Sequence, residues 1–148
     1  MKSILVVVAL FQSLLTTGAA FAEPEYTKVE ISIDIDISAT DLWARVGGYC
    51  DIRDWANIGC DITSGDGEMG TVRTLTVPSG KIVEILIAKT DLAYGYTQPV
   101  QEGSFYNLYH GFMEARPIDE NHSKLLYTVV YDLSDLPDQA AKTADIAG

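Results

Sequence analysis

The stretch from Gly70 to Leu86 constrains the fold most strongly, because two runs rich in β-branched residues flank a short turn. The turn, Pro78-Ser79-Gly80, consists of residues that favour chain reversal, so the stretch predicts a β-hairpin. In a register that places Val77 opposite Ile82, alternate residues share one face: Arg73, Leu75, Ile82, Glu84 and Leu86. The arginine and the glutamate are then diagonal neighbours among aliphatic side chains. An opposite-charge pair in such surroundings indicates a concave, partly dry interior.

The length and charge of the chain limit what it can be. Its 148 residues suffice for one domain with a real core. Its formal net charge of −11 argues against nucleic acids and anionic membrane surfaces as partners, because both attract basic patches.

Residues 1–22 have the features of a signal peptide. A short basic start precedes an apolar run from Ile4 to Leu15, and Ala20-Phe21-Ala22 provides small residues at a signal-peptidase site. The apolar run is too short to span a bilayer. We therefore expect cleavage before Glu23, a single secreted or periplasmic domain over residues 23–148, and no stable membrane insertion after cleavage. The alternative is an uncleaved N-terminal anchor.

The first half of the mature chain predicts one strand followed by two short helices. Apolar residues alternate with polar ones from Val29 to Ile37, which is typical of a half-buried strand with an acidic outer face. Ser38 is a suitable N-cap for a helix that ends at Gly47-Gly48. A second short helix is expected from Asp51 to Trp55.

The rest of the chain predicts six more strands and a final helix. The strands are centred on Ile62, on the two arms of the hairpin, and on the runs Tyr94–Val100, Phe105–Arg116 and Lys124–Asp132. The turns between them are short, so the pairing should be antiparallel. A helix from Asp138 to Ala147 has about three turns. This helix is short against the longest strands, so we expect apolar sheet surface to stay exposed, which allows a homo-oligomer.

The sequence contains no motif that fixes a catalytic site, a metal site or a cofactor. His110 and His122 are too few and too far apart for a ligand cluster. No local motif identifies a nucleophile, and no glycine-rich phosphate loop opens a helix. We therefore predict no catalytic residue, no metal and no cofactor.

Two cysteines in an exported chain, Cys50 and Cys60, favour a disulfide between them. They flank the second short helix and the next strand. The alternative is a pair of buried free thiols.

This order of elements resembles the START-related, helix-grip (SRPBCC) superfamily, which includes the polyketide cyclase/dehydrase and lipid-transport group. The residues that carry the resemblance are Ser38–Trp43, Trp55, Cys60, Gly70–Arg73 and Glu84. The similarity covers roughly residues 29–132. It implies an α+β fold of the order β-αα-β6-α, in which a seven-stranded curved antiparallel sheet wraps a C-terminal helix, here apparently shortened.

By the same resemblance, a cavity lies between the sheet and the C-terminal helix. The ligand-binding residues that it implies are Trp55, Arg73, Glu84, Tyr96, Tyr106, Leu108 and His110. Trp55 would lie near the mouth of the cavity.

Two functions fit these features, and a partner-binding or stress-related module is a third class that they leave open. The first is a non-catalytic binding protein for a small hydrophobic or amphipathic ligand, lipid-like or polyketide-like, because a ligand cavity usually combines apolar walls with few polar groups. The second is a polyketide cyclase or dehydratase, in which Arg73 would stabilise an enolate and a tyrosine would transfer a proton. We favour the first, because Glu84 neutralises Arg73. The sequence does not identify the ligand.

Overall fold

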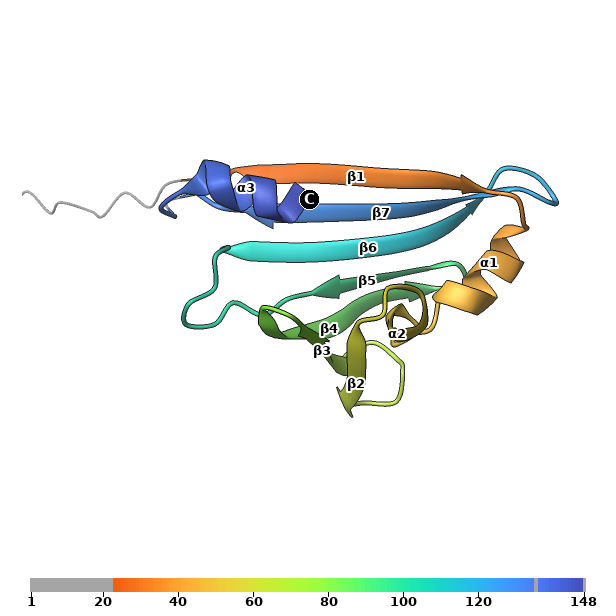
Figure 1. Cartoon of the computed structure of the whole chain (residues 1–148), viewed down its shortest axis with the longest axis horizontal. Coiled ribbons are helices and arrows are strands. Elements are labelled where there is room, and N and C mark those ends of the chain that lie inside the picture. Colours follow the sequence, from red (N-terminus) through yellow and green to blue (C-terminus); the bar gives the residue numbers. More distant parts are fainter. Residues whose placement is uncertain (1–22, 135, 148) are drawn as a thin grey trace, which may run out of the picture.

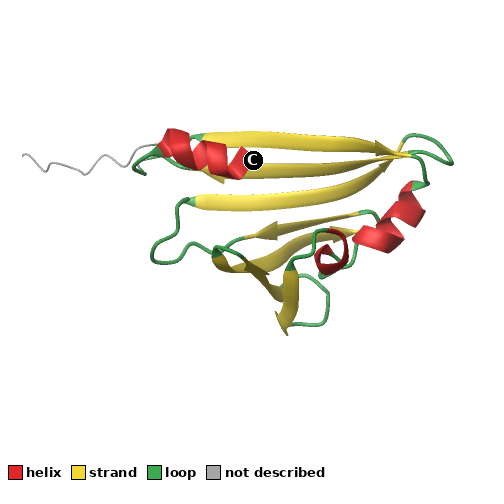
Figure 2. Ribbon diagram, viewed as in Figure 1, coloured by secondary structure: helices red, strands yellow, loops and turns green. Residues whose placement is uncertain are grey.

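A seven-stranded antiparallel sheet forms the body of the computed structural model, which describes residues 23–134 and 136–147 (Figures 1 and 2). The elements are β1 (Tyr26–Ile35), α1 (Ala39–Val46), α2 (Ile52–Trp55), β2 (Gly59–Ser64), β3 (Val72–Val77), β4 (Gly80–Thr90), β5 (Ala93–Thr97), β6 (Leu108–Pro117), β7 (Ser123–Asp132) and α3 (Gln139–Ala147). This confirms the predicted α+β order β-αα-β6-α. The predicted signal peptide lies outside the described residues.

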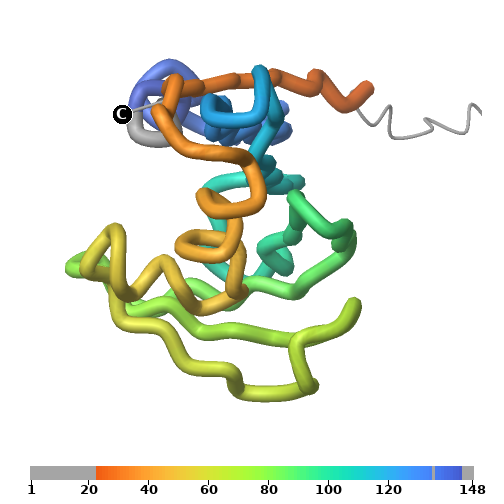
Figure 3. Tube along the Cα trace, turned by 90° about the vertical axis from the view of Figure 1, so that its right-hand side faces the viewer, coloured from red at the N-terminus to blue at the C-terminus, as the bar shows by residue number. Residues whose placement is uncertain are grey.

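The strand order is β1-β7-β6-β5-β4-β3-β2. Strands β2 to β7 follow one another as neighbours, and β7 then pairs along its length with β1, from Tyr26↔Asp132 to Ile35↔Ser123. The turned view shows a strongly curved sheet, with β1 and β7 at the top and β2 to β4 at the bottom (Figure 3). The curvature creates a concave inner face, which carries Arg73, Glu84, Tyr96 and Met113.

The hairpin forms as predicted, but the predicted register is wrong by two residues. Val77 pairs with Gly80 instead of Ile82, so Pro78 and Ser79 alone make the turn. Proline suits this position because its φ is already fixed, and Gly80 accepts a φ of 139°. Because the shift is an even number of residues, the predicted face is kept. The shift also places Arg73 directly opposite Glu84.

Helix α1 covers one end of the inner face. The Ser38 hydroxyl caps the helix by accepting from the Asp41 N–H at 3.1 Å, and the Gly47 N–H closes the last turn on the Trp43 carbonyl. Leu42 is buried in a cluster that includes Ala115 of β6. The helix therefore ties the end of β1 to the middle of the sheet.

Strand β1 is less buried than its alternating pattern predicts. Ile31 and Ile33 are 55% and 58% exposed, so the prediction of a half-buried strand is wrong at these positions. Strand β1 lies at the edge of the sheet, where only β7 flanks it. Apolar sheet surface is exposed here, as expected for a short final helix. Over residues 23–134 and 136–147, no helix is long and apolar enough to cross a membrane.

Candidate functional site

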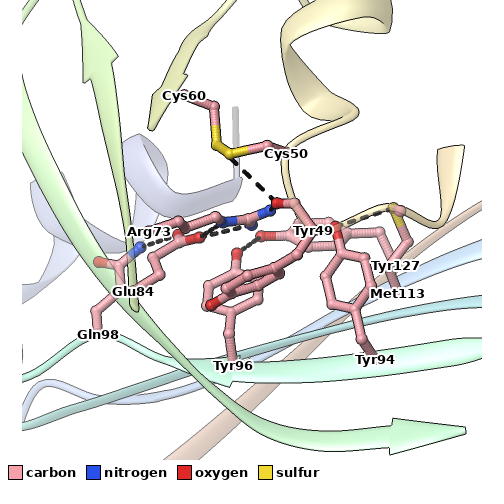
Figure 4. A network of polar contacts seen from close by, with 10 residues as sticks. All are labelled: Tyr49, Cys50, Cys60, Arg73, Glu84, Tyr94, Tyr96, Gln98, Met113 and Tyr127. Atoms are coloured by element: carbon pink, nitrogen blue, oxygen red, sulfur yellow. Dashed lines mark hydrogen bonds and ion pairs between the residues drawn. A yellow bond between two sulfur atoms is a disulfide. The ribbon is translucent and has the colours of Figure 1, made fainter. Parts of the chain in front are cut away.

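The centre of the inner face is a buried ion pair between β3 and β4. Arg73 Nη2 lies 2.6 Å from Glu84 Oε2, and Arg73 Nε donates to the same oxygen at 2.7 Å (Figure 4). Each residue is 1% exposed. Two N–H groups on one carboxylate hold the pair in a fixed geometry.

Other groups compensate the arginine on its remaining sides. Its Nη1 donates to the backbone carbonyl of Tyr49. Its guanidinium carbon lies 4.2 Å from the ring centre of Tyr49 and 5.2 Å from that of Tyr96. Aromatic faces attract a cation, and the attraction grows when water is excluded. The charge of Arg73 is therefore satisfied within the protein.

The second carboxylate oxygen of Glu84 accepts from Gln98 Nε2 at 3.1 Å. Burial raises the pKa of the Glu84 carboxyl, although Arg73 and Gln98 oppose this shift. Burial acts against the charged form of Arg73, but the neighbouring Glu84 and Tyr94 together outweigh it, so the pKa of the guanidinium is raised. The arginine thus remains charged.

A cluster of tyrosines extends from the ion pair across β5, β6 and β7. The Tyr96 and Tyr127 hydroxyls lie 2.6 Å apart, and the Tyr94 hydroxyl donates to the Met113 sulfur at 3.9 Å (Figure 4). The Tyr96 ring fits over Gly111, where a Cβ would fall 2.3 Å from Tyr96 Cζ. Burial raises the pKa of Tyr94 and Tyr96, so both phenols are neutral near pH 7 and act as hydrogen-bonding groups, not as bases.

A cavity of about 760 Å³ lies beside this cluster, between β4 and the β5–β6 connection. It is lined by Ser79–Val83, Gln98, Pro99, Gln101–Tyr106 and Tyr109. Apolar and aromatic side chains from Ile82, Val83, Phe105, Tyr106 and Tyr109 form much of the wall. Gln98 lines the cavity and also bonds Glu84, so it connects the cavity to the ion pair.

A smaller cavity of about 240 Å³ lies on the other side of the cluster. Its walls include Trp43, Tyr49, Leu86 and Tyr94. The tyrosines therefore separate two spaces of different size.

The structure brings together three of the predicted site residues. Arg73, Glu84 and Tyr96 form the buried cluster. The resemblance implied that they line the ligand cavity, but they do not line the larger cavity. Tyr106 does line it. Trp55 is 47% exposed on α2 and lines neither cavity, so the structure does not place it at a mouth.

The predictions for Leu108 and His110 are wrong about the face. The register pairs Gly111 with Tyr96 and Met113 with Tyr94, so the odd-numbered residues of β6 share the inner face. Leu108 and His110 therefore lie on the opposite face of the strand. The residues of β6 that sequence reasoning missed are Tyr109 and Met113.

Gln98 and Tyr49 were also missed, and a signal existed for only one of them. Gln98 continues the alternation of Tyr94 and Tyr96, so it could have been placed on the inner face from the sequence. Tyr49 lies in a turn after α1, where no periodicity applies.

A disulfide joins Cys50 to Cys60, with 5.6 Å between the Cα atoms. It links the segment after α1 to β2. Cys50 directly follows Tyr49, whose carbonyl accepts from Arg73, so the disulfide anchors one wall of the buried cluster (Figure 4).

Comparisons with known proteins give a family and a fold. The model of a family described as polyketide cyclase/dehydrase and lipid transport matches residues 26–147. No curated protein matches the sequence significantly.

Several solved structures have the same fold. An uncharacterized protein from Bacillus thuringiensis is 22% identical, with a TM-score of 0.67 over 81% of this chain and 88% of that one. A protein from Thermobifida fusca is 21% identical, with a TM-score of 0.69 over 82% of each chain. Norcoclaurine synthase from Thalictrum flavum, in complex with dopamine and hydroxybenzaldehyde, is 16% identical, with a TM-score of 0.68 over 91% of this chain and 86% of that one.

Proposed function

This chain belongs to the polyketide cyclase/dehydrase and lipid-transport family, and from that premise we propose that it binds a small hydrophobic or amphipathic ligand. The ligand is lipid-like or polyketide-like in character. The binding site is the cavity between β4 and the β5–β6 connection. The observation that carries this proposal is the size and lining of that cavity.

The cavity has the properties of a small-molecule site. Its volume of about 760 Å³ falls within the range of roughly 300–1,000 Å³ that is typical of ligand pockets. Its walls combine aromatic and aliphatic side chains with polar ones, among them Lys81, Gln98 and Glu102, which suits an amphipathic ligand. A solved relative in fold, the norcoclaurine synthase, holds dopamine and hydroxybenzaldehyde, so the fold accommodates small aromatic molecules in that protein.

The buried ion pair supports binding instead of catalysis. Three nitrogens of Arg73 already have acceptors, two on Glu84 and one on Tyr49. A guanidinium in this state has little capacity left for an enolate. We assign the pair to holding Gln98, which presents the polar end of the site to the ligand.

Filling the cavity tests the proposal. Ile82→Trp should weaken binding of the fluorescent apolar probe 1-anilinonaphthalene-8-sulfonate at least tenfold, because the indole occupies the space of the ligand. Ile87→Trp is the matched control: it makes the same change in the same strand, at a residue that does not line the cavity. Binding by Ile87→Trp should stay within twofold of the parent protein. Equal binding by both variants would exclude this cavity as the site.

We also propose that the mature protein is secreted or periplasmic. The support is the pattern of residues 1–22 and the disulfide, which forms in oxidising compartments. Intact-mass measurement of exported protein should show the loss of Met1 to Ala22. Recovery of a full-length exported species would contradict cleavage.

A further inference from the structure

The sheet has an internal gap where β5 stops pairing with β4. The pairing between the two strands runs to Ile85↔Thr97, but β4 continues to Gly80 with β3 as its partner. The larger cavity lies along this unpaired part of β4, on the side where β5 would otherwise continue. Figure 1 shows the short β5 and the connection to β6 that departs from it.

The backbone groups of Lys81 and Val83 point into this gap. The backbone N–H and carbonyl of Leu86 both face β3. The N–H donates to the Thr71 carbonyl at 2.9 Å, and the carbonyl accepts from the Gly70 N–H at 2.8 Å. Backbone direction alternates along a strand, so the groups of Val83 and Lys81 point the other way. Among the described residues, neither has a backbone partner on the cavity side.

The sequence explains why β5 does not fill the gap. If the register of Ile85 with Thr97 continued, Pro99 would lie opposite Val83, and proline has no N–H to donate. Gln101 would lie opposite Lys81, but its N–H is bonded to the Ser104 hydroxyl at 2.8 Å. The two donors that could complete the ladder are therefore missing or already used.

Resting on the proposed function, we propose that this free edge of β4 binds a secondary amide carried by the hydrophobic ligand. The Val83 carbonyl accepts from the N–H of the acyl amide, and the Val83 N–H donates to the next carbonyl of the ligand, one carbon beyond that nitrogen, as in an added β-strand. The apolar part of the ligand packs against Ile82, Phe105 and Tyr109, which line the same cavity. The ligand class is an acyl chain joined to an amino acid or a similar amide.

A pair of probes tests this directly on the full chain. N-dodecanoyl-glycine amide should bind roughly tenfold more tightly than the ester in which oxygen replaces the acylated N–H, because the ester loses one hydrogen bond and faces the Val83 carbonyl with a lone pair. Equal affinity for both probes would overturn the amide proposal and leave the proposed function intact. Binding of neither probe would count against both.

A second measurement does not depend on affinity. The Val83 amide should exchange with solvent rapidly in the free protein, and the amide probe should slow its exchange at least tenfold. Pro99→Ala restores an N–H opposite Val83, so this variant should slow the exchange without ligand and weaken amide binding. Pro117→Ala, at the far end of β6, is the control and should change neither. Slow exchange at Val83 in the free parent protein would show that the edge is already paired, and would overturn the proposal.

Discussion

Replacing Arg73 by methionine is expected to lower the free energy of unfolding by about 3–5 kcal/mol. The reason is the position of Glu84, which is 1% exposed and lies directly opposite Arg73 in the hairpin. Without the guanidinium, its carboxylate has the Gln98 amide as its remaining side-chain partner. Denaturant unfolding followed by circular dichroism measures the loss.

The double variant decides what the pair contributes. Arg73→Met combined with Glu84→Leu removes both charges, and replacing a buried pair by apolar residues is often neutral in stability. We expect the double variant to recover most of the loss. Arg116→Met is the control for an arginine in an exposed pair with Glu114, and it should cost no more than about 1 kcal/mol. A double variant as unstable as Arg73→Met would contradict this account of the pair.

The same double variant also separates structural from functional roles. Without Glu84, Gln98 loses the acceptor that fixes its amide beside the cavity. We therefore expect the double variant to fold but to bind 1-anilinonaphthalene-8-sulfonate more weakly than the parent protein. Undiminished binding at recovered stability would leave the pair as a structural feature alone.

The pH dependence of the pair follows from Glu84. Burial raises its pKa in the folded protein above the value of the unfolded chain. Such a group adds most to stability below its unfolded pKa, and the contribution falls as the pH rises through the folded value. Replacing Glu84 removes this pH dependence, so the double variant also reports on it.

Alternation along strands predicted much of the fold and part of the site. It placed Arg73 and Glu84 on one face of a hairpin, and this survived a register error of two residues because side chains repeat with that period. The same rule failed for β6, where Leu108 and His110 were assigned to the inner face. An error of one residue reverses the face of a strand, and an uninterrupted run of apolar and aromatic residues does not indicate which face is buried.

Other features of the site depend on contacts that no local pattern encodes. The carbonyl of Tyr49 reaches Arg73 from a turn that lies 24 residues earlier in the chain. The gap beside Val83 depends on the absence of one N–H at Pro99, and this has meaning only once the β4–β5 register is known. The sequence contains Pro99, but only the pairing of the sheet shows that Val83 is the residue that it leaves unpaired.

Removing the disulfide is expected to lower the free energy of unfolding by about 3 kcal/mol in the chain-entropy model, because Cys50 and Cys60, 10 positions apart, close a short loop. The variant is Cys50→Ala with Cys60→Ala, and thermal or denaturant unfolding measures the change. The parent protein with its disulfide reduced is the control, since it lacks the bond but keeps both side chains.

The disulfide also holds the segment that carries the Tyr49 carbonyl, which Arg73 needs as an acceptor. The cysteine replacements should therefore lower the free energy of unfolding less in the Arg73→Met and Glu84→Leu double variant than in the parent protein. Titration of the unfolded, unreduced protein should detect no free thiol, and two reactive thiols would contradict the bond itself.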